Sequence, residues 1–223
     1  RIYDRRASLS DLGIDTSGRE TELYVNYRTS HEIATWANTL KSDSGISDLG
    51  DLVRRPSSRH RSLLHGSSPI CVEETTAREL SSHLAFQVAS WIEKGVVPQE
   101  IAVASRSKAS YPVINAALSS ASVDISVYEP GGIDLEGVRV STMHSLKGLE
   151  FQCVALFDVN DESLPASWLL EAGDLDPSDR DQLLNREHCL LYMAATRARD
   201  ELWVGWAGAP SRFLEAVLAP ENT

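Results

Sequence analysis

Two short segments combine the polar and charged side chains that nucleotide and nucleic-acid sites use. Residues 142–151 read TMHSLKGLEF, and residues 191–199 read LYMAATRAR. Each segment lies at the end of an apolar stretch, where a fold can present polar groups to a ligand. The two segments together therefore predict a site for a nucleotide and a nucleic acid.

The sequence lacks part of what hydrolysis of a nucleoside triphosphate needs. That reaction uses a backbone cradle for the phosphates, a carboxylate for Mg²⁺, a group that orients water, and positive charge on the γ-phosphate. The chain contains no G-x-x-x-x-G-K-[ST] cradle, because Lys147 and Gly148 stand in reversed order without the upstream glycine. We therefore expect the cradle, the Mg²⁺ site and the water-orienting group to lie outside this chain.

Arg197 is the candidate for the positive charge. It follows Leu190 and Ala194 at helical spacing, so in a helix it lies at the edge of the buried face. A guanidinium in that position can bind phosphate oxygens through two hydrogen bonds and is permanently charged. The alternative is an ordinary surface arginine beside Asp200 and Glu201.

Composition predicts a globular chain with a packed core and excludes one mode of DNA binding. Of the 223 residues, 42% are apolar, which is ample for one large domain. The net charge of −11 has the wrong sign for a protein that coats DNA by bulk electrostatics. A motor that touches a strand through a few local groups is compatible with this charge. The first residue is Arg1, so we expect a piece of a longer protein.

The cysteines, histidines and apolar runs indicate the cellular compartment of the protein and whether it binds a metal. Cys71, Cys153 and Cys189 are widely spaced in apolar stretches and are expected to be buried, reduced thiols of a cytoplasmic protein. His60 and His65 have no Cys or carboxylate partner at ligand spacing, so no metal site is expected. No apolar run approaches the roughly 20 residues of a membrane span, so no membrane partner is expected.

Hydrophobic periodicity predicts alternating strands and helices, and therefore an α/β domain with a mainly parallel sheet. Strands are expected over residues 22–26, 70–73, 101–104, 123–128, 138–142, 153–158 and 202–206. Helices are expected over residues 31–41, 76–94, 109–120, 179–199 and 211–218. Residues 1–20 are expected to form a lead-in loop. Residues 42–69 are expected to form a flexible loop region. Its basic stretch 54–61 is expected to be a solvated loop, and contact with a phosphate backbone is the alternative.

Three stretches, in a fixed order, resemble the motifs of one family. Residues 26–30 (NYRTS) resemble the NYRS segment of motif IV, residues 142–151 resemble motif V, and residues 187–199 resemble motif VI. The chain thus resembles the C-terminal motor domain, or 2A domain, of the UvrD/Rep/PcrA class of superfamily 1 DNA helicases. The resemblance implies a RecA-like three-layer fold, similar to P-loop NTPases but without its own P-loop.

The resemblance also implies one domain over residues 1–223. Members such as UvrD carry a large 2B domain inserted before motif V. Between Tyr128 and Val138 this chain has room only for a loop. We therefore expect a compact variant without a large 2B insertion.

The resemblance assigns five residues to the ATP site. Arg197 would be the arginine finger, and its neighbours complete the TRA of motif VI. Arg28 would be a second γ-phosphate contact, so both arginines are catalytic candidates. Tyr27 would stack on adenine, although an ordinary strand-end aromatic is the alternative. Glu150 would accept a hydrogen bond from the ribose, and Gly148 would allow the backbone to turn closely.

The resemblance assigns the rest of motif V to DNA. Thr142 and His144 would touch single-stranded DNA and couple it to the nucleotide over a short path, with Ser145 and Lys147 in the same contact set. The alternative for His144 is a packed strand-end histidine. One departure concerns motif VI, where Glu187 is followed by His188 and Cys189 instead of the arginines that the family often has. Any internal ion pair of those arginines is therefore in doubt.

The function implied is that of an ATP-dependent DNA helicase or translocase that moves 3′ to 5′ and acts in processes such as DNA repair. Its expected ligands are ATP, Mg²⁺, single-stranded DNA and the N-terminal RecA-like domain of the same full-length chain. The isolated chain is expected to be inactive. A helicase-like scaffold without hydrolysis is the alternative, but it has no need for Arg28, Glu150 and Arg197 together. The helicase arm of a nuclease complex is a third possibility.

Overall fold

A six-stranded, all-parallel sheet forms the centre of the protein. The computed structural model describes residues 25–42, 61–127, 136–171 and 176–219. The strand order is β3-β8-β7-β4-β6-β5, and every neighbouring pair is parallel. The strands are β3 (Ile70–Glu74), β4 (Ile101–Ser105), β5 (Ile125–Val127), β6 (Val138–Thr142), β7 (Phe151–Phe157) and β8 (Ala198–Ala207). The predicted α/β class with a parallel sheet is confirmed.

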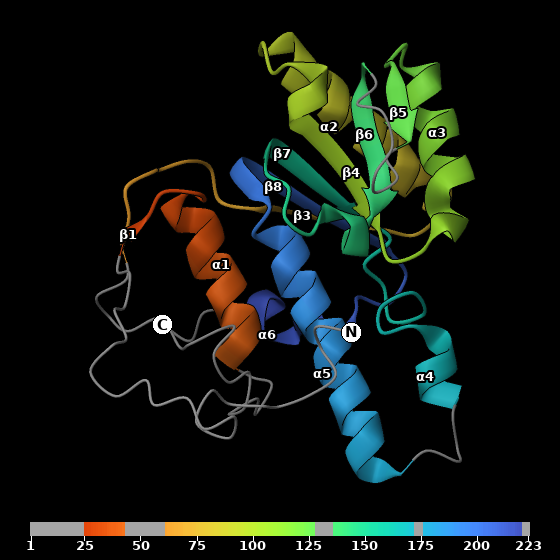
Figure 1. Cartoon of the computed structure of the whole chain (residues 1–223). Coiled ribbons are helices and arrows are strands. Elements are labelled where there is room, and N and C mark those ends of the chain that lie inside the picture. Colours follow the sequence, from red (N-terminus) through yellow and green to blue (C-terminus); the bar gives the residue numbers. More distant parts are fainter. Residues whose placement is uncertain (1–24, 43–60, 128–135, 172–175, 220–223) are drawn as a thin grey trace.

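Helices cover both faces of this sheet, which gives three layers (Figure 1). One face packs against α1 (His31–Ser42), α5 (Pro177–Ala195) and α6 (Glu215–Leu218). The other face packs against α2 (Ala77–Glu93) and α3 (Tyr111–Ser120). A short helix, α4 (Ser167–Glu171), contacts α5. The described residues also form four 3₁₀ turns: η1 (Pro98–Glu100), η2 (Lys108–Ser110), η3 (Met143–Leu146) and η4 (Arg212–Leu214).

Burial explains why the central elements form where the sequence predicts them. All residues of β4 are buried, as expected for a parallel strand that is covered on both faces. In α2, Leu80, Leu84, Val88 and Trp91 are fully buried and line one face of the helix. A capping box begins this helix, because the Thr76 hydroxyl oxygen accepts from the Glu79 N–H and the Glu79 carboxylate accepts from the Thr76 N–H.

The end of α5 differs from the prediction. We expected a helix through residue 199, but the helix ends at Ala195 and β8 begins at Ala198. Ala198 pairs with Phe151 of β7, and the Phe151 N–H donates to the Arg197 carbonyl oxygen at 3.0 Å. Sheet pairing therefore overrides the helix-favouring Ala-Arg sequence at this point.

The predicted loop region contains a strand. Residues Arg61–Ser62 form β2, which pairs in parallel with β1 (Val25–Asn26). Two residues are too few to show a periodic pattern, so the sequence carried no signal for this strand. Residues 1–24 and 43–60 lie outside the described residues, as does most of the loop expected between Tyr128 and Val138. The predictions for those stretches are therefore not addressed by the structure.

Gly205 in β8 offers a test of the core. A Cβ added there would overlap the ring of Trp203 and lie 2.7 Å from Cδ1 of Leu80. Both neighbouring side chains are buried, so neither can move into solvent. We expect Gly205→Ala to lower the free energy of unfolding by about 1–3 kcal/mol, the usual cost of overpacking a core. Urea unfolding followed by tryptophan fluorescence measures this, and an unchanged midpoint would contradict the packing described.

Candidate nucleotide and nucleic-acid site

The predicted site residues divide between the two edges of the sheet. Parallel strands all begin at one edge, the amino edge, and all end at the other, the carboxyl edge. The amino-edge cluster lies beside the starts of β7 and β8 and consists of Tyr27, Arg28, Glu150 and Arg197. The carboxyl-edge cluster follows the end of β6 and consists of Thr142, His144 and Ser145.

The turn between β1 and α1 fixes the position of Tyr27 and Arg28. Its next two residues, Thr29 and Ser30, are buried, and the Ser30 N–H donates to the Arg199 carbonyl oxygen of β8 at 2.8 Å. The Ser30 hydroxyl oxygen accepts from the N–H of the third residue beyond it at 3.4 Å, which is the geometry of a helix N-cap. The turn is thus attached to the start of β8, and the Tyr27 side chain is left 70% exposed.

Arg28 and Glu150 form an ion pair across two distant parts of the sequence. The guanidinium Nε of Arg28 contacts the carboxylate of Glu150, and both side chains are about half exposed, at 52% and 49%. The Arg28 backbone N–H also donates to the Asn26 side-chain oxygen at 2.9 Å. The fold therefore brings together one positive and one negative group that the sequence analysis assigned to the same ligand.

Arg197 lies next to this pair, in the turn that joins α5 to β8. Its Nε donates to the Met193 carbonyl oxygen at 3.1 Å and its Nη1 to the Leu149 carbonyl oxygen at 3.3 Å. Leu149 precedes Glu150, so the half-buried guanidinium borders the ion pair. The expectation that Arg197 lies within a helix is wrong, since the helix has already ended. The C-terminal carbonyls of a helix attract a cation, which explains this position.

Residues 142–151 connect the two clusters by crossing the sheet. Thr142 pairs with Ser105 at the carboxyl edge, whereas Cys153, just inside β7, pairs with Ile101 at the start of β4. Ile101 and Ser105 are four residues apart along β4, which corresponds to about 13 Å in an extended strand. β6 and β7 lie on either side of β4, so the chain must return from the carboxyl edge to the amino edge between them. The prediction of a short path from Thr142 to Glu150 is therefore wrong.

Local contacts order the first half of this crossing segment. The Thr142 hydroxyl caps η3 by accepting from the Ser145 N–H, and the two hydroxyl oxygens lie 3.0 Å apart. Met143 and Leu146 are fully buried in the core on the α5 face. The buried residues fix the crossing segment to the sheet, while His144 remains accessible on its outer side.

The second half of the crossing segment contains a sharp turn. Lys147 is exposed, and its N–H donates to the His144 carbonyl oxygen at 3.3 Å. Gly148 has φ +82°, a left-handed conformation that glycine adopts without strain, and an added Cβ would meet nothing within 4 Å. The glycine therefore serves the turn itself and not a close approach to another part of this chain.

Partial desolvation and one cation hold the His144 ring in its neutral form. Desolvation lowers the pKa of His144 below its usual value, Arg106 lowers it further, and Glu187 opposes the shift. These two charged residues come from the end of β4 and from α5. The shift favours the neutral ring, which can donate one hydrogen bond and accept one.

Arg106 and Glu187 form an ion pair that the sequence analysis did not identify. Nε of Arg106 lies 2.5 Å from one carboxylate oxygen of Glu187, and Nη2 lies 2.7 Å from the other. The side chains are 19% and 11% exposed. The Ala166 N–H adds a third hydrogen bond to Glu187 at 3.3 Å. The available signal was Arg106, a charged residue that follows the apolar run of residues 101–104 after a single serine.

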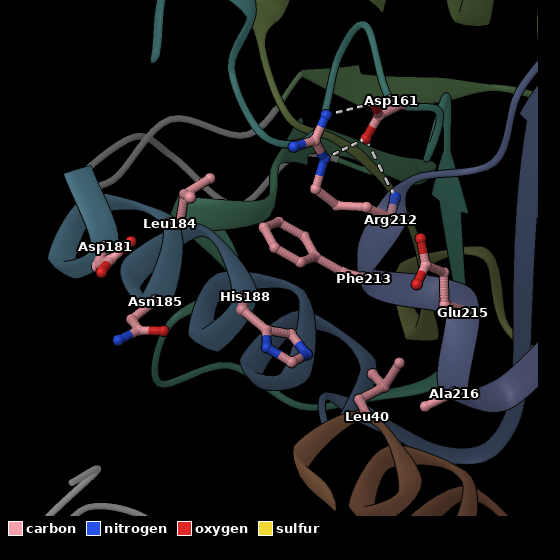
Figure 2. Close-up of a pocket in the computed structure, with 10 residues that line it drawn as sticks. All are labelled: Leu40, Asp161, Asp181, Leu184, Asn185, His188, Arg212, Phe213, Glu215 and Ala216. Carbon is pink, nitrogen blue, oxygen red and sulfur yellow. Dashed lines mark hydrogen bonds and ion pairs between the residues drawn. The ribbon is translucent and has the colours of Figure 1, made fainter. Parts of the chain in front are cut away.

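A cavity of about 740 Å³ opens between α5, α6 and the end of α1 (Figure 2). His188 stacks on Phe213 in its wall, with ring centroids 4.8 Å apart. Asp161 binds Arg212 through two hydrogen bonds of 2.7 and 2.6 Å, which lower the pKa of that carboxyl group. None of the predicted site residues lines this cavity.

All three cysteines are free thiols, and they differ in burial. No three His, Cys, Asp or Glu side chains there are grouped so that they could hold a metal ion. Cys153 is buried and desolvation raises its pKa to about 12, but Cys71 is exposed because β3 is an edge strand. The expectation of buried thiols is thus wrong for Cys71. None of the helices in the same ranges has the length and apolar content of a membrane crossing.

Part of this chain is similar to known DNA helicases. Residues 129–209 match the family described as the UvrD-like helicase C-terminal domain. ATP-dependent DNA helicase UvrD2 of Mycobacterium tuberculosis is 34% identical over 98 residues, which cover 40% of this chain and 13% of UvrD2. The putative ATP-dependent DNA helicase YjcD of Bacillus subtilis is 35% identical over 100 residues, 40% of this chain and 12% of YjcD.

A solved structure agrees with the fold. The C-terminal domain of a possible DNA helicase from Lactobacillus plantarum has a TM-score of 0.58 with 20% identity, and the match covers 87% of this chain and 95% of that one. The matched family region contains the crossing segment, α5 and the turn that carries Arg197. The resemblance to UvrD-like helicase C-terminal domains is thus confirmed over residues 129–209, about a third of the chain.

Proposed function

We propose that the chain is the second RecA-like motor domain of an ATP-dependent DNA helicase or translocase. In this proposal, ATP binds between the amino-edge cluster and the N-terminal RecA-like domain of the same full-length protein. The observation that carries the proposal is the convergence of Arg28, Glu150 and Arg197, from three separate segments, at one edge of a helicase C-terminal domain. The relatives that match this chain are named as ATP-dependent DNA helicases.

Each member of the amino-edge cluster has a role that its position supports. Arg197 supplies positive charge to the γ-phosphate as the arginine finger, and Arg28 supplies a second charge. Glu150 accepts from the ribose hydroxyl, and the exposed Tyr27 ring stacks on adenine. Gly148 gives the backbone the turn that presents Glu150. The guanidinium of Arg197 exchanges two backbone carbonyl oxygens for phosphate oxygens when ATP binds.

The carboxyl-edge cluster is the proposed contact with single-stranded DNA. Thr142, Ser145 and His144 offer two hydroxyls and a neutral imidazole, and Lys147 adds one exposed positive charge. Few, local contacts of this kind fit the net charge of −11, because they do not require a basic surface. Closure of the ATP cleft would move these groups along the DNA strand. The direction of movement would be 3′ to 5′, as in the family that the chain resembles.

In this proposal Mg²⁺ and the phosphate cradle are held mainly by the N-terminal domain. Among the described residues no group of three or more His, Cys, Asp or Glu side chains could hold a metal ion. We further propose that residues 1–223 are one cytoplasmic domain without a large 2B insertion, because only a short segment joins β5 to β6.

ATP hydrolysis by the full-length protein tests the proposal. We expect ATPase activity that single-stranded DNA stimulates, unwinding of a DNA duplex with a 3′ single-stranded tail, and no turnover by residues 1–223 alone. Steady-state ATPase assays with and without DNA measure this. Absence of hydrolysis by the full-length protein would favour the scaffold alternative, and DNA-stimulated turnover by residues 1–223 alone would refute the shared site.

Replacement of His144 tests the DNA side of the site. We expect His144→Ala to lower the stimulation of the ATPase by single-stranded DNA about 5-fold or more, the lower range of allosteric couplings, and to change the basal rate less. His83→Ala is the matched control, because His83 is exposed on α2, on the other face of the sheet. An equal fall in both rates, with a lowered melting temperature, would show that His144 only stabilises the fold.

A further inference from the structure

α5 connects the two clusters without passing through the crossing segment. Glu187, in the middle of α5, binds Arg106 at the carboxyl ends of the strands, and Arg197 follows the end of the same helix at the amino edge. Eight helical residues separate Glu187 from the last residue of α5, which is about 12 Å of rise. A single straight element therefore reaches from the neighbourhood of His144 to the proposed arginine finger.

We propose that the Arg106–Glu187 ion pair is a positioning device that couples the single-strand contacts to Arg197 through α5. The inference deepens the proposed function and rests on it. In this role neither residue touches ATP. Glu187 fixes the register of α5 against the end of β4, and a shift of the DNA-contacting segment at this point is transmitted along the helix to the finger.

The geometry of the pair supports a fixed connection. Both nitrogen–oxygen contacts are at most 2.7 Å, and the bidentate arrangement restricts rotation as well as distance. The Ala166 N–H binds the same carboxylate, so the loop after β7 is attached to the same point. Because both side chains are mostly buried, α5 cannot slide along the sheet without leaving a charge unpaired in the interior.

His144 lies within the electrostatic reach of this pair. Ser105, which precedes Arg106, pairs with Thr142, two residues before His144, and the charges of Arg106 and Glu187 act on the pKa of the His144 ring in opposite directions. η3, which carries His144, also packs directly against α5. Single-stranded DNA bound at His144 would therefore lie close to both the Arg106–Glu187 pair and α5.

The experiment compares two paired replacements in the full-length protein. Arg106→Gln/Glu187→Gln removes both charges and leaves none unpaired. The control, Arg212→Gln/Asp161→Asn, removes another bidentate pair, which joins the loop after β7 to η4 instead of to α5 (Figure 2). Basal ATPase, ATPase at saturating single-stranded DNA, DNA affinity by fluorescence anisotropy, and melting temperature are measured for each.

We expect the Arg106→Gln/Glu187→Gln variant to lose about 5-fold or more of its DNA stimulation, with basal turnover and DNA affinity near wild type, and the control to keep its stimulation. A wild-type stimulation factor in the first variant, or an equal loss in the control, would overturn the inference. If that variant melts below the assay temperature, the ratio of DNA-stimulated to basal ATPase is measured for Arg106→Lys instead. Lysine keeps the positive charge but cannot form the bidentate hydrogen bonds of arginine. Absence of DNA stimulation in the wild-type protein would instead refute the proposed function itself.

Discussion

Arg197→Ala in the full-length protein is expected to cut ATP turnover by a factor on the order of 10³, the usual contribution of an arginine finger, and to leave nucleotide binding nearly intact. The reason is that the guanidinium borders the Arg28–Glu150 pair but is bound here by backbone carbonyls, which it can exchange for phosphate oxygens. Arg197→Lys should restore little, since an ammonium cannot form the planar fork. Single-turnover hydrolysis and equilibrium binding of a fluorescent nucleotide separate the two effects.

Arg199→Ala is the matched control for this prediction. Arg199 is the next arginine along the chain, but it is exposed and binds Asp200 through two hydrogen bonds of 3.0 and 3.1 Å. We expect its replacement to change turnover little. A similar loss in both variants, or near-wild-type turnover for Arg197→Ala, would mean that Arg197 is only a structural link between α5 and β7.

The fold could be predicted from the sequence wherever burial produces a periodic pattern of apolar residues. β4 was predicted within one residue because its side chains are buried on both faces, and α2 because one stripe of the helix is buried. The prediction failed where long-range pairing decides. The last turn expected for α5 became the start of β8 because Ala198 pairs with Phe151, and β2 is a strand only because β1 lies beside it.

The candidate site, like the fold, could be predicted only in part from the sequence. Motif order and residue types identified Arg28 and Glu150 as parts of one site, and the structure brings them into contact. Spacing along the chain could not show that Thr142 and Glu150 lie at opposite edges, because that depends on the strand order β7-β4-β6. The Arg106–Glu187 pair was hidden for the same reason, since its members come from separate elements.

Arg28→Ala is expected to lower ATP turnover by a factor of about 10², the cost of removing one preorganised electrostatic contact from a transition state. The residue is held at the amino edge by the buried Thr29 and Ser30, so its side chain can leave Glu150 and reach a phosphate without refolding of the turn. The loss should appear mainly in kcat, because the γ-phosphate gains charge-stabilising contacts chiefly in the transition state.

Glu150→Gln separates this role from that of the ion pair. If Arg28 serves the phosphate and Glu150 the ribose, Glu150→Gln breaks the same pair but should raise KM for ATP with little change in kcat. Arg78→Ala, an exposed arginine in the first turn of α2, controls for the loss of one positive charge. Equal kinetic defects in Arg28→Ala and Glu150→Gln would show that the ion pair acts only as a link between the turn and β7, and would remove Arg28 from the phosphate site.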